Sequence, residues 1–406
     1  MNIKHTSKKT RRILIDNQPK NLFAEDKYAH LYEERALLLA TDNDIVILRK
    51  LLPDEYLRFV MVNSKFQVVF LRSFDNMQDL VDTILDKYNI CLIREAIKID
   101  LSLFDNIIQA YIPDERIDLL ATEFGIPVCG QNFYMCNHKK SDTQRICMDL
   151  RLNVIPSLLI NELADFDKKE VFDFINAQNN IVIKPNIGVG GQSINFYSTE
   201  KTPNSLSKPV IIQKFLDAQF EGSIQFIKFP EGWRIFFCET LQNNNKFFGF
   251  KYPFPTINYT DLQKSAYKFL DYFATKYGDD LPSFGIDFII NNEEIFFHDI
   301  NPRSTGVTYI FSLLLRLYGE NALNDYEIIY LQRECDHKYS YSELKNKLDK
   351  CGLIHISQNT TDGYALLYPS LLEARLINIL LVSSIGKVRE YYRMISPVIG
   401  QPYIKN

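Results

Sequence analysis

The chain has 406 residues and a mass of 47.4 kDa, and 46% of its residues are hydrophobic. Such a chain can bury a substantial core and has room for two or three domains, which excludes intrinsic disorder and a small disulfide-stapled fold. Its 46 Lys and Arg against 50 Asp and Glu give a net charge of -4. Because no bulk positive field is present, we expect no nucleic-acid partner and no anionic membrane partner, so the function must come from a local site.

The seven cysteines are scattered and form no CxxC pair, which predicts neither a disulfide framework nor a structural zinc site. No apolar run approaches the roughly 18 residues of a membrane span. The basic start, Met1–Arg12, has no apolar segment behind it and is therefore not a secretory signal. These features predict a cytoplasmic protein, and they leave open whether identical copies associate.

Residues 1–135 carry the pattern of an α/β domain. Short apolar runs bounded by polar residues predict strands at Ile13–Ile15, Ile45–Leu48, Phe66–Leu71 and Ile90–Ile93. Between these runs, apolar residues recur three and four positions apart over Lys27–Leu39 and Met77–Lys87, as in helices packed on a sheet. No glycine-rich phosphate turn accompanies the strands, so this region shows no nucleotide motif of its own.

The middle of the chain begins with helices and continues with strands. We expect helices over Tyr111–Phe124, stopped by Gly125, and over Ser141–Leu150. Strands are expected at Ile181–Lys184, Ser193–Tyr197, Val210–Gln213, Ser223–Phe229, Trp233–Leu241, Ser283–Ile290 and Glu294–Ile300. One long amphipathic helix, Asp261–Tyr277, interrupts them, and its aromatic stripe indicates core packing.

The tail, Leu331–Asn406, shows no pattern with an evident chemistry. Its composition predicts a charged helix at Ser342–Lys350, short strands at Leu353–Ser357 and Tyr364–Tyr368, and an apolar helix at Leu371–Ser383.

A lysine followed by a glycine-rich loop is the first chemical signal. The predicted strand ends at Lys184, and the loop Gly188–Ser193 follows before the next strand. Glycine lets backbone N-H groups approach an anion closely, and a lysine adds a point charge for phosphate oxygens. An ordinary glycine-rich hairpin is the alternative. The pair Lys139–Lys140 stands just before the helix expected at Ser141, where a phosphate could also use the amide ends of the helix, although such pairs are usually only solvated.

Acidic residues on a predicted hairpin are the second signal. The strands Ser283–Ile290 and Glu294–Ile300 bring Asp287 near Asp299. Because strand side chains alternate, Asp299, Asn301 and Arg303 should share one face, whereas His298 should lie on the other. Carboxylate and amide oxygens suit Mg²⁺, which usually keeps waters and shares substrate phosphates. A solvated strand face is the alternative, but unpaired carboxylates on such apolar strands would be costly.

Taken in order and approximate spacing, these segments resemble the ATP-grasp ligases over about residues 136 to 320. The residues that carry the resemblance are Lys184 with its glycine loop, the run Val210–Leu216, Glu221–Ile224, Asp287, and the run Asp299–Arg303. A narrower resemblance, to the pre-ATP-grasp region of ligases that form peptide bonds, lies in Arg35–Ala40, Asp44–Leu48 and Pro53–Leu57. The fold implied is α/β, and α+β in the nucleotide-binding part, with an N-terminal pre-ATP-grasp domain.

The resemblance implies a role for each matching residue. ATP would be held by Lys140 (or its neighbour Lys139), Lys184, Gly188, Gly190, Gly191, Gln192, Ser193, Gln213, Lys214, Phe215, Leu216 and Glu221. In the family, the lysines hold the α- and β-phosphates, the glycine loop closes over the triphosphate, the hinge backbone meets the adenine, and the acidic residue binds the ribose. Metal ligands would be Asp287, Asp299 and Asn301, and the catalytic cations would be Arg303, Arg234 and Lys251.

The resemblance also implies domains and an activity. The domains would be 1–135 (pre-ATP-grasp), 136–213 (lid), 214–330 (metal site) and 331–406 (extension). With ATP and Mg²⁺ or Mn²⁺ as cofactors, the chain would join a small carboxylate to an amine, such as amino acids or short peptides, through an acyl phosphate, and release ADP and phosphate.

Two departures from the family pattern keep other activities open. The family usually has Glu where Asp299 stands, and an acidic residue is common where Gln213 stands. One alternative is an ATP-grasp carboxylase or kinase-like enzyme, and the lack of a biotin-accepting segment counts against the carboxylase. The other alternative is a catalytically silent ATP-binding regulatory protein.

Overall fold

The computed structural model describes residues 9–19, 28–72, 79–98, 104–178, 180–188, 195–198, 209–229, 232–243, 246–255, 259–319 and 321–400. The chain divides into two compact units. Unit 1 combines Met1–Gln131 with Gly306–Asn406, and unit 2 is Asn132–Thr305. The four domains expected from the sequence remain a prediction. Among the described residues, no helix has the length and apolar character needed to cross a membrane.

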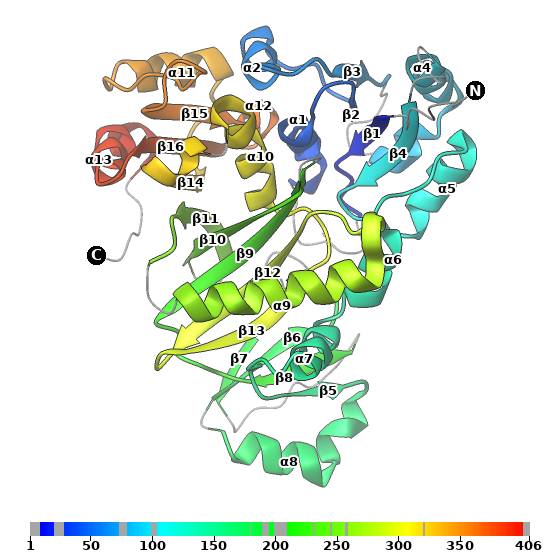
Figure 1. Cartoon of the computed structure of the whole chain (residues 1–406). Coiled ribbons are helices and arrows are strands. Elements are labelled where there is room, and N and C mark those ends of the chain that lie inside the picture. The colour runs from blue at the N-terminus through cyan, green and yellow to red at the C-terminus, as the bar shows by residue number, and fades with distance from the viewer. Residues whose placement is uncertain are drawn as a thin grey trace, which may run out of the picture. The chain divides into compact units, whose positions relative to one another are not determined.

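The N-terminal part of unit 1 is built on a parallel sheet with strand order β3-β2-β1-β4 (Figure 1). Its strands are β1 (Lys9–Ile15), β2 (Ile45–Leu48), β3 (Gln67–Phe70) and β4 (Phe104–Ala110). Its helices are α1 (Ala36–Leu39), α2 (Asp54–Val60), α3 (Leu80–Ile84), α4 (Lys87–Lys98) and α5 (Glu115–Phe124). Apolar side chains of β1, β2 and β4 pack with those of α3, α4 and α5 in one buried cluster.

The C-terminal part of unit 1 contains an antiparallel sheet with strand order β14-β16-β15. Its elements are α10 (Gly306–Tyr318), β14 (Tyr326–Glu334), α11 (Tyr341–Asp349), β15 (Gly363–Leu367), α12 (Pro369–Leu372), β16 (Leu376–Ser384) and α13 (Val388–Ile399). Partly buried polar contacts join it to the N-terminal part. The Arg316 guanidinium donates to the carbonyls of Leu37, Ala40 and Val60, where α1 and α2 end.

Unit 2 contains two antiparallel sheets. The smaller sheet has the order β5-β8-β6-β7, from β5 (Ser157–Ile160), β6 (Asn180–Pro185), β7 (Asn195–Ser198) and β8 (Val210–Lys214). The larger has the order β13-β12-β9-β10-β11, from β9 (Phe220–Phe229), β10 (Gly232–Asn243), β11 (Lys246–Tyr252), β12 (Phe284–Asn291) and β13 (Glu294–Asn301). The helices are α6 (Gln131–Asn137), α7 (Lys140–Asp149), α8 (Lys169–Asn176) and α9 (Tyr259–Tyr277).

An aromatic core fixes which face of the larger sheet is covered. Helix α9 lies across the sheet (Figure 1), and Phe269 and Phe273 from the helix pack with Phe226, Phe284 and other buried residues of the strands. The aromatic stripe of this helix is therefore core, as predicted. The polar residues that alternate with this core along β9, β12 and β13 must lie on the opposite face.

Three predicted elements are wrong, and one prediction is only partly right. Ile90–Ile93 belongs to α4, because Ile93, Ala96 and Ile97 are buried at helical spacing. Most of Leu371–Ser383 lies in strand β16, which is buried except for its last residue, since a mainly apolar stretch does not distinguish a buried strand from a helix. Leu353–Ser357 forms isolated bridges only. In the described part of Lys27–Leu39, two 3-10 turns precede the short helix α1.

A buried carboxyl of unit 1 yields a test of stability against pH. Glu34 is 2% exposed and accepts from the backbone N-H of Ser370 at 2.8 Å. Burial raises its pKa from 4.5 to about 8, although the hydrogen bond from Ser370 acts in the opposite direction. Between these values the folded protein holds a proton that the unfolded chain has lost. The stability that this group contributes at low pH is therefore lost as the pH rises from about 4.5 to about 8.

We expect Glu34→Gln to flatten this dependence, because the amide cannot ionise but still accepts from Ser370. The substitution should remove a slope of up to roughly 1.4 kcal/mol per pH unit from the free energy of unfolding plotted against pH. Urea unfolding at a series of pH values measures it, and Glu390→Gln, at an exposed position on α13, is the control. Equal slopes for Glu34→Gln and the unmodified protein would contradict the assignment.

Candidate active site

Strand register brings the predicted carboxylates together on the sheet face opposite α9. Asp287 of β12 pairs with Ser223 of β9 on one side and with Asp299 of β13 on the other. Directly opposed residues of antiparallel strands share a face, with their Cβ atoms about 5 Å apart. Ser223, Asp287 and Asp299 therefore form a row, and Gln225, Gly285 and Asn301 form the next row by the same pairings.

A β-bulge changes the place expected for His298. The register passes from Asp287↔Asp299 to Phe288↔Phe297, so His298 is an extra residue on β13. Phe297 and Ile300 both belong to the core under α9, so two residues, His298 and Asp299, lie between core positions where strict alternation allows one. The alternation on which the prediction for His298 rests is therefore interrupted at this residue. Burial, followed by the charge of Lys184, lowers the pKa of His298 to about 3.

Helix α7 presents Lys140 to this row. Its Nζ atom donates to Asp299 Oδ2 at 2.8 Å. The backbone N-H of Lys140 donates to the Asn186 carbonyl at 2.8 Å, and Ile300 N donates to Thr143 Oγ1 at 3.0 Å. These bonds tie the helix to both β13 and the segment after β6. Of the two lysines that the sequence left open, the structure brings Lys140 to Asp299 and leaves Lys139 at the N-cap of α7.

Lys184 reaches the same group from the smaller sheet. It lies near the end of β6, is 5% exposed, and its Nζ atom is 3.5 Å from the His298 carbonyl oxygen. Burial and the nearby charge of Lys140 lower its pKa to about 8. Two lysines, one from the smaller sheet of unit 2 and one from α7, thus converge on two carboxylates. The structure thus brings the two lysines close to the two carboxylates, although these residues are far apart in the sequence.

The two carboxylates differ electrostatically. Burial and the negative charge of Asp299 raise the pKa of Asp287 to about 6, against hydrogen bonds from Ser223 and Asn301. Burial also opposes ionisation of Asp299, but the charges of Lys140 and Lys184 outweigh it and lower its pKa. Glu221 shares this face, and its pKa is raised by burial and then by Asp287. The group is therefore a mixed cluster in which each cation has an acidic neighbour.

Asn301 and Arg303 complete the end of β13. Asn301 Nδ2 donates to Asp287 Oδ2 at 3.0 Å, which leaves its amide oxygen for another partner. Arg303 is 8% exposed and its guanidinium donates to the Ser304 carbonyl at 3.2 Å. Its backbone N-H donates to the Asn301 carbonyl at 2.7 Å, so the chain turns tightly between these two predicted residues.

The two remaining predicted cations lie on different faces. Arg234 of β10 pairs with Ile227, which places it on the face of Gln225 and Asp287. Lys251 of β11 pairs with Glu239, which in turn pairs with Gly222. Since Gly222 pairs with Phe288 of the core, this register puts Lys251 on the face opposite Asp287. The structure does not bring Lys251 to the site, because its strand position has the wrong parity.

The predicted hinge spans the last two residues of β8 and the two residues after it, and backbone hydrogen bonds hold it to its surroundings. Lys214 N donates to the Pro156 carbonyl and Phe215 N to the Asn180 carbonyl, each at 3.0 Å. Gln213 is 7% exposed and pairs with both Ser157 and Val182. Leu216 follows directly. Of the predicted glycine loop, only Gly188 is described, and Gly190, Gly191, Gln192 and Ser193 lie outside the described residues.

Three polar residues beside the carboxylates were not predicted from the sequence. Ser223, Gln225 and Thr305 are 4%, 1% and 9% exposed, and they are joined to one another by hydrogen bonds. Ser223 and Gln225 alternate with the core residues Ile224 and Phe226 along β9. That alternation of polar and apolar residues is the sequence signal that could have identified them.

The donor set fits a hard divalent cation. It consists of the Asp287 and Asp299 carboxylates and the Asn301 amide oxygen, which are oxygen donors of the kind that Mg²⁺ binds through one or two carboxylates. Among the residues that the structure describes, no group of three or more His, Cys, Asp or Glu side chains could hold a metal. With two carboxylates and one amide oxygen, the set resembles a Mg²⁺ site that water and substrate oxygens complete.

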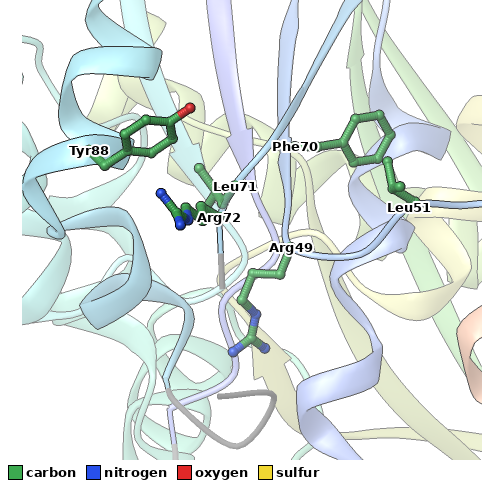
Figure 2. A pocket seen from close by; sticks show the side chains of 6 residues that line it. All are labelled: Arg49, Leu51, Phe70, Leu71, Arg72 and Tyr88. Carbon is green, nitrogen blue, oxygen red and sulfur yellow. The ribbon is translucent and has the colours of Figure 1, made fainter. Parts of the chain in front are cut away.

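A separate hollow lies in unit 1, at the carboxyl ends of β2 and β3. It measures about 490 Å³ and is lined by Arg49, Leu51, Phe70, Leu71, Arg72 and Tyr88 (Figure 2). The Arg49 guanidinium is ion-paired with Glu33, and that of Arg72 lies 5.5 Å from the centre of the Tyr88 ring. None of the residues predicted for the active site lines this hollow.

Comparison with a family model identifies the domain. Residues 150–307 match the model described as the ATP-grasp domain. This part of the chain is therefore an ATP-grasp domain, which confirms the resemblance, and the mixed α/β fold class with an N-terminal parallel sheet is confirmed with it. No curated protein matches the sequence.

Solved structures share the fold over nearly the whole chain. The N5-carboxyaminoimidazole ribonucleotide synthetase from Thermus thermophilus has a TM-score of 0.62 and 12% identity, covering 98% of this chain and 100% of that chain. The Staphylococcus aureus synthetase complexed with ADP has a TM-score of 0.55 and 11% identity, covering 96% of both. The Aspergillus clavatus synthase in complex with ADP and 5-aminoimidazole ribonucleotide has a TM-score of 0.57 and 11% identity, covering 97% of this chain and 99% of that chain.

Gly285 yields a test of the packing at this site. A Cβ atom there would lie 2.9 Å from both Gln225 Nε2 and Thr305 Cγ2. We expect Gly285→Ala to lower the free energy of unfolding by about 1–3 kcal/mol, because buried neighbours must move. Gly306→Ala is the control, since a Cβ at Gly306 meets nothing within 4 Å. Chemical denaturation of both variants measures the difference, and equal stabilities would show that the site tolerates the extra methyl group.

Proposed function

We propose that the chain is an ATP-dependent ligase that joins a carboxylate to an amine through an acyl phosphate and releases ADP and phosphate. The observation that carries the proposal is the convergence of Lys140 and Lys184 on the opposed carboxylates Asp287 and Asp299. Such a cluster, within an ATP-grasp domain, combines cations for phosphate oxygens with carboxylates for a divalent cation. Neighbours of the same fold that were solved with ADP support the choice of nucleotide.

The nucleotide would extend from the hinge to the lysines. The backbone of Gln213–Leu216 would meet the adenine, and Glu221 would accept from the ribose hydroxyls. Lys140 and Lys184 would hold the α- and β-phosphates, and the loop from Gly188 to Ser193 would cover the triphosphate. Glu221 lies on the sheet face of Asp287, two positions before Ser223, which is consistent with a ribose near the metal-binding row.

Charge neutralisation would be shared between the acidic row and the cations. Asp287, Asp299 and Asn301 would hold Mg²⁺ or Mn²⁺, which neutralises charge on the β- and γ-phosphates when bound. Arg303, with Arg234 on the same face, would orient the carboxylate for attack on the γ-phosphorus. The amine then displaces phosphate from the acyl phosphate, so no protein nucleophile is needed.

A second candidate differs in the carboxylate. The similar solved structures are named as synthetases of a carboxylated amine, and a pyruvate carboxylase from Rhizobium etli also shares the fold over 80% of this chain. These names favour bicarbonate as the group that is phosphorylated, with a small amine as acceptor. Amino acids and short peptides, expected from the narrower sequence resemblance, remain the first candidate's substrates.

Phosphorus NMR of the products tests the proposal. The full chain is incubated with ATP and Mg²⁺, and with bicarbonate, amino acids, short peptides and small amines added singly and in pairs. We expect ADP and phosphate only when a carboxylate and an amine are both present. Bicarbonate dependence would select the second candidate. Formation of AMP and pyrophosphate would contradict the acyl-phosphate route, and tight ATP binding with no turnover in any mixture would indicate a silent homologue.

Two substitutions should separate binding from turnover. We expect Lys184→Ala to weaken ATP binding, because a buried cation near the phosphate position is lost. Arg303→Ala should leave ATP binding nearly unchanged and lower kcat by about 10² to 10³, as loss of a preorganised charge does. Calorimetric titration with ATP and steady-state kinetics measure the two effects. A fully active Arg303→Ala variant would remove Arg303 from the mechanism.

A further inference from the structure

A chain of hydrogen bonds leads to Asp287 from the end of unit 2. Thr305 Oγ1 donates to Gln225 Oε1 at 2.7 Å, and Gln225 Nε2 donates to Ser223 Oγ at 2.7 Å. Ser223 lies directly opposite Asp287 on the neighbouring strand, which places its hydroxyl to donate to the Asp287 carboxylate. The Ser223 Oγ atom is also 3.5 Å from the Ile286 carbonyl oxygen. Ser223 and Gln225 lie on the same sheet face as Asp287, beside the row of carboxylates.

The placement of the Gln225 amide sets the direction of this chain, with its oxygen toward the Thr305 hydroxyl and its Nε2 toward Ser223. Ser223 accepts from Gln225, so its own single hydroxyl proton goes to a different acceptor. Among side chains of this length only glutamine offers both an acceptor for Thr305 and a donor for Ser223. A glutamate would accept from both hydroxyls and withdraw the Ser223 proton from Asp287.

Gly285 makes room for the chain. It pairs with Gln225 on β9, and a Cβ atom at this position would meet the Gln225 amide and the Thr305 methyl group at 2.9 Å. The missing side chain lets Gln225 lie along the strand toward Ser223. Asp287 therefore receives one hydrogen bond from Ser223 on β9 and one from Asn301 on β13, and both flanking strands restrict its carboxylate.

We propose that Gln225 is a positioning residue, which acts through Ser223 to hold the Asp287 carboxylate in the orientation that binds a divalent cation. This inference rests on the proposed function, in which Asp287 is a metal ligand. Hydrogen-bond partners of metal ligands commonly change metal affinity by about 10- to 100-fold when they are removed. Gln225, being 1% exposed and bonded at both ends, is the member of the chain whose loss frees Ser223 to turn toward other acceptors.

The proposal is tested by titrating the full chain with Mn²⁺ at saturating ADP. The EPR signal of free Mn²⁺ measures how much of the metal is bound. We expect Gln225→Met to weaken Mn²⁺ binding by about 10-fold and to leave metal-free ADP binding unchanged. Ser223→Ala should have the same effect. The matched control is Gln144→Met, which breaks another glutamine–serine pair of unit 2, with Ser157, at 3.1 and 3.2 Å. This control should leave Mn²⁺ affinity within about twofold of the unmodified protein, because the pair is not joined to a proposed ligand.

A double mutant separates positioning from general destabilisation. Thr305→Val removes the hydroxyl that fixes the Gln225 amide and should weaken Mn²⁺ binding several-fold on its own. Combined with Gln225→Met it should add nothing, because its effect passes through the amide. If Gln225→Met does not fold, Thr305→Val alone decides, and an unchanged Mn²⁺ affinity would overturn the proposal.

Asp287→Asn distinguishes failure of this inference from failure of the proposed site. If that variant binds Mn²⁺ as the unmodified protein does, Asp287 is not a ligand and the metal assignment is wrong. If Asp287→Asn loses Mn²⁺ while Gln225→Met and Ser223→Ala match the Gln144→Met control, the metal site stands and the positioning role of Gln225 is overturned.

Discussion

The site depends on holding two carboxylates opposite each other on neighbouring strands. Like charges at directly opposed positions of an antiparallel pair repel, and partial burial strengthens the repulsion. Asp287 and Asp299 are stable there because each has compensating partners. Lys140 contacts Asp299 at 2.8 Å, and Asn301 donates to Asp287 at 3.0 Å. The opposite directions of their pKa shifts follow from this unequal compensation, since the cations lie on the Asp299 side.

The scaffold brings the compensating charges from separate elements. Lys184 comes from the smaller sheet and Lys140 from α7, and Asn186 accepts from the N-terminal backbone of that helix. The bond from Ile300 N to Thr143 Oγ1 then fixes the helix against β13. A displacement of α7 would therefore move Lys140 away from Asp299 and loosen the contact between the two sheets. Helix α7 couples the phosphate-binding lysines of the proposed site to its acidic row.

Sequence patterns predicted the parts of the fold and of the site that depend on local periodicity. The shared face of Asp287 and Asp299 follows from a period of two, and α9 has a clear apolar stripe. The prediction for His298 assumed strict alternation, but a bulge adds one residue to β13, and no local composition signals it. Strand β16 is buried along all but its last residue, so it lacks the alternation that marks a strand with one wet face. Lys140 and Asp299 are 159 residues apart, and their contact depends on tertiary packing that cannot be read from local sequence patterns.

The short side chain of Asp299 is compatible with a working site on geometric grounds. Where the family usually has glutamate, the aspartate carboxylate lies closer to its own strand by one methylene. The bulge at His298 alters the local path of β13, and Lys140 meets Asp299 directly. The aspartate is therefore long enough to contact Lys140. Burial of Lys184 near Asp287 and Asp299 is costly unless its charge has a partner, so the arrangement is consistent with a site that binds charged groups.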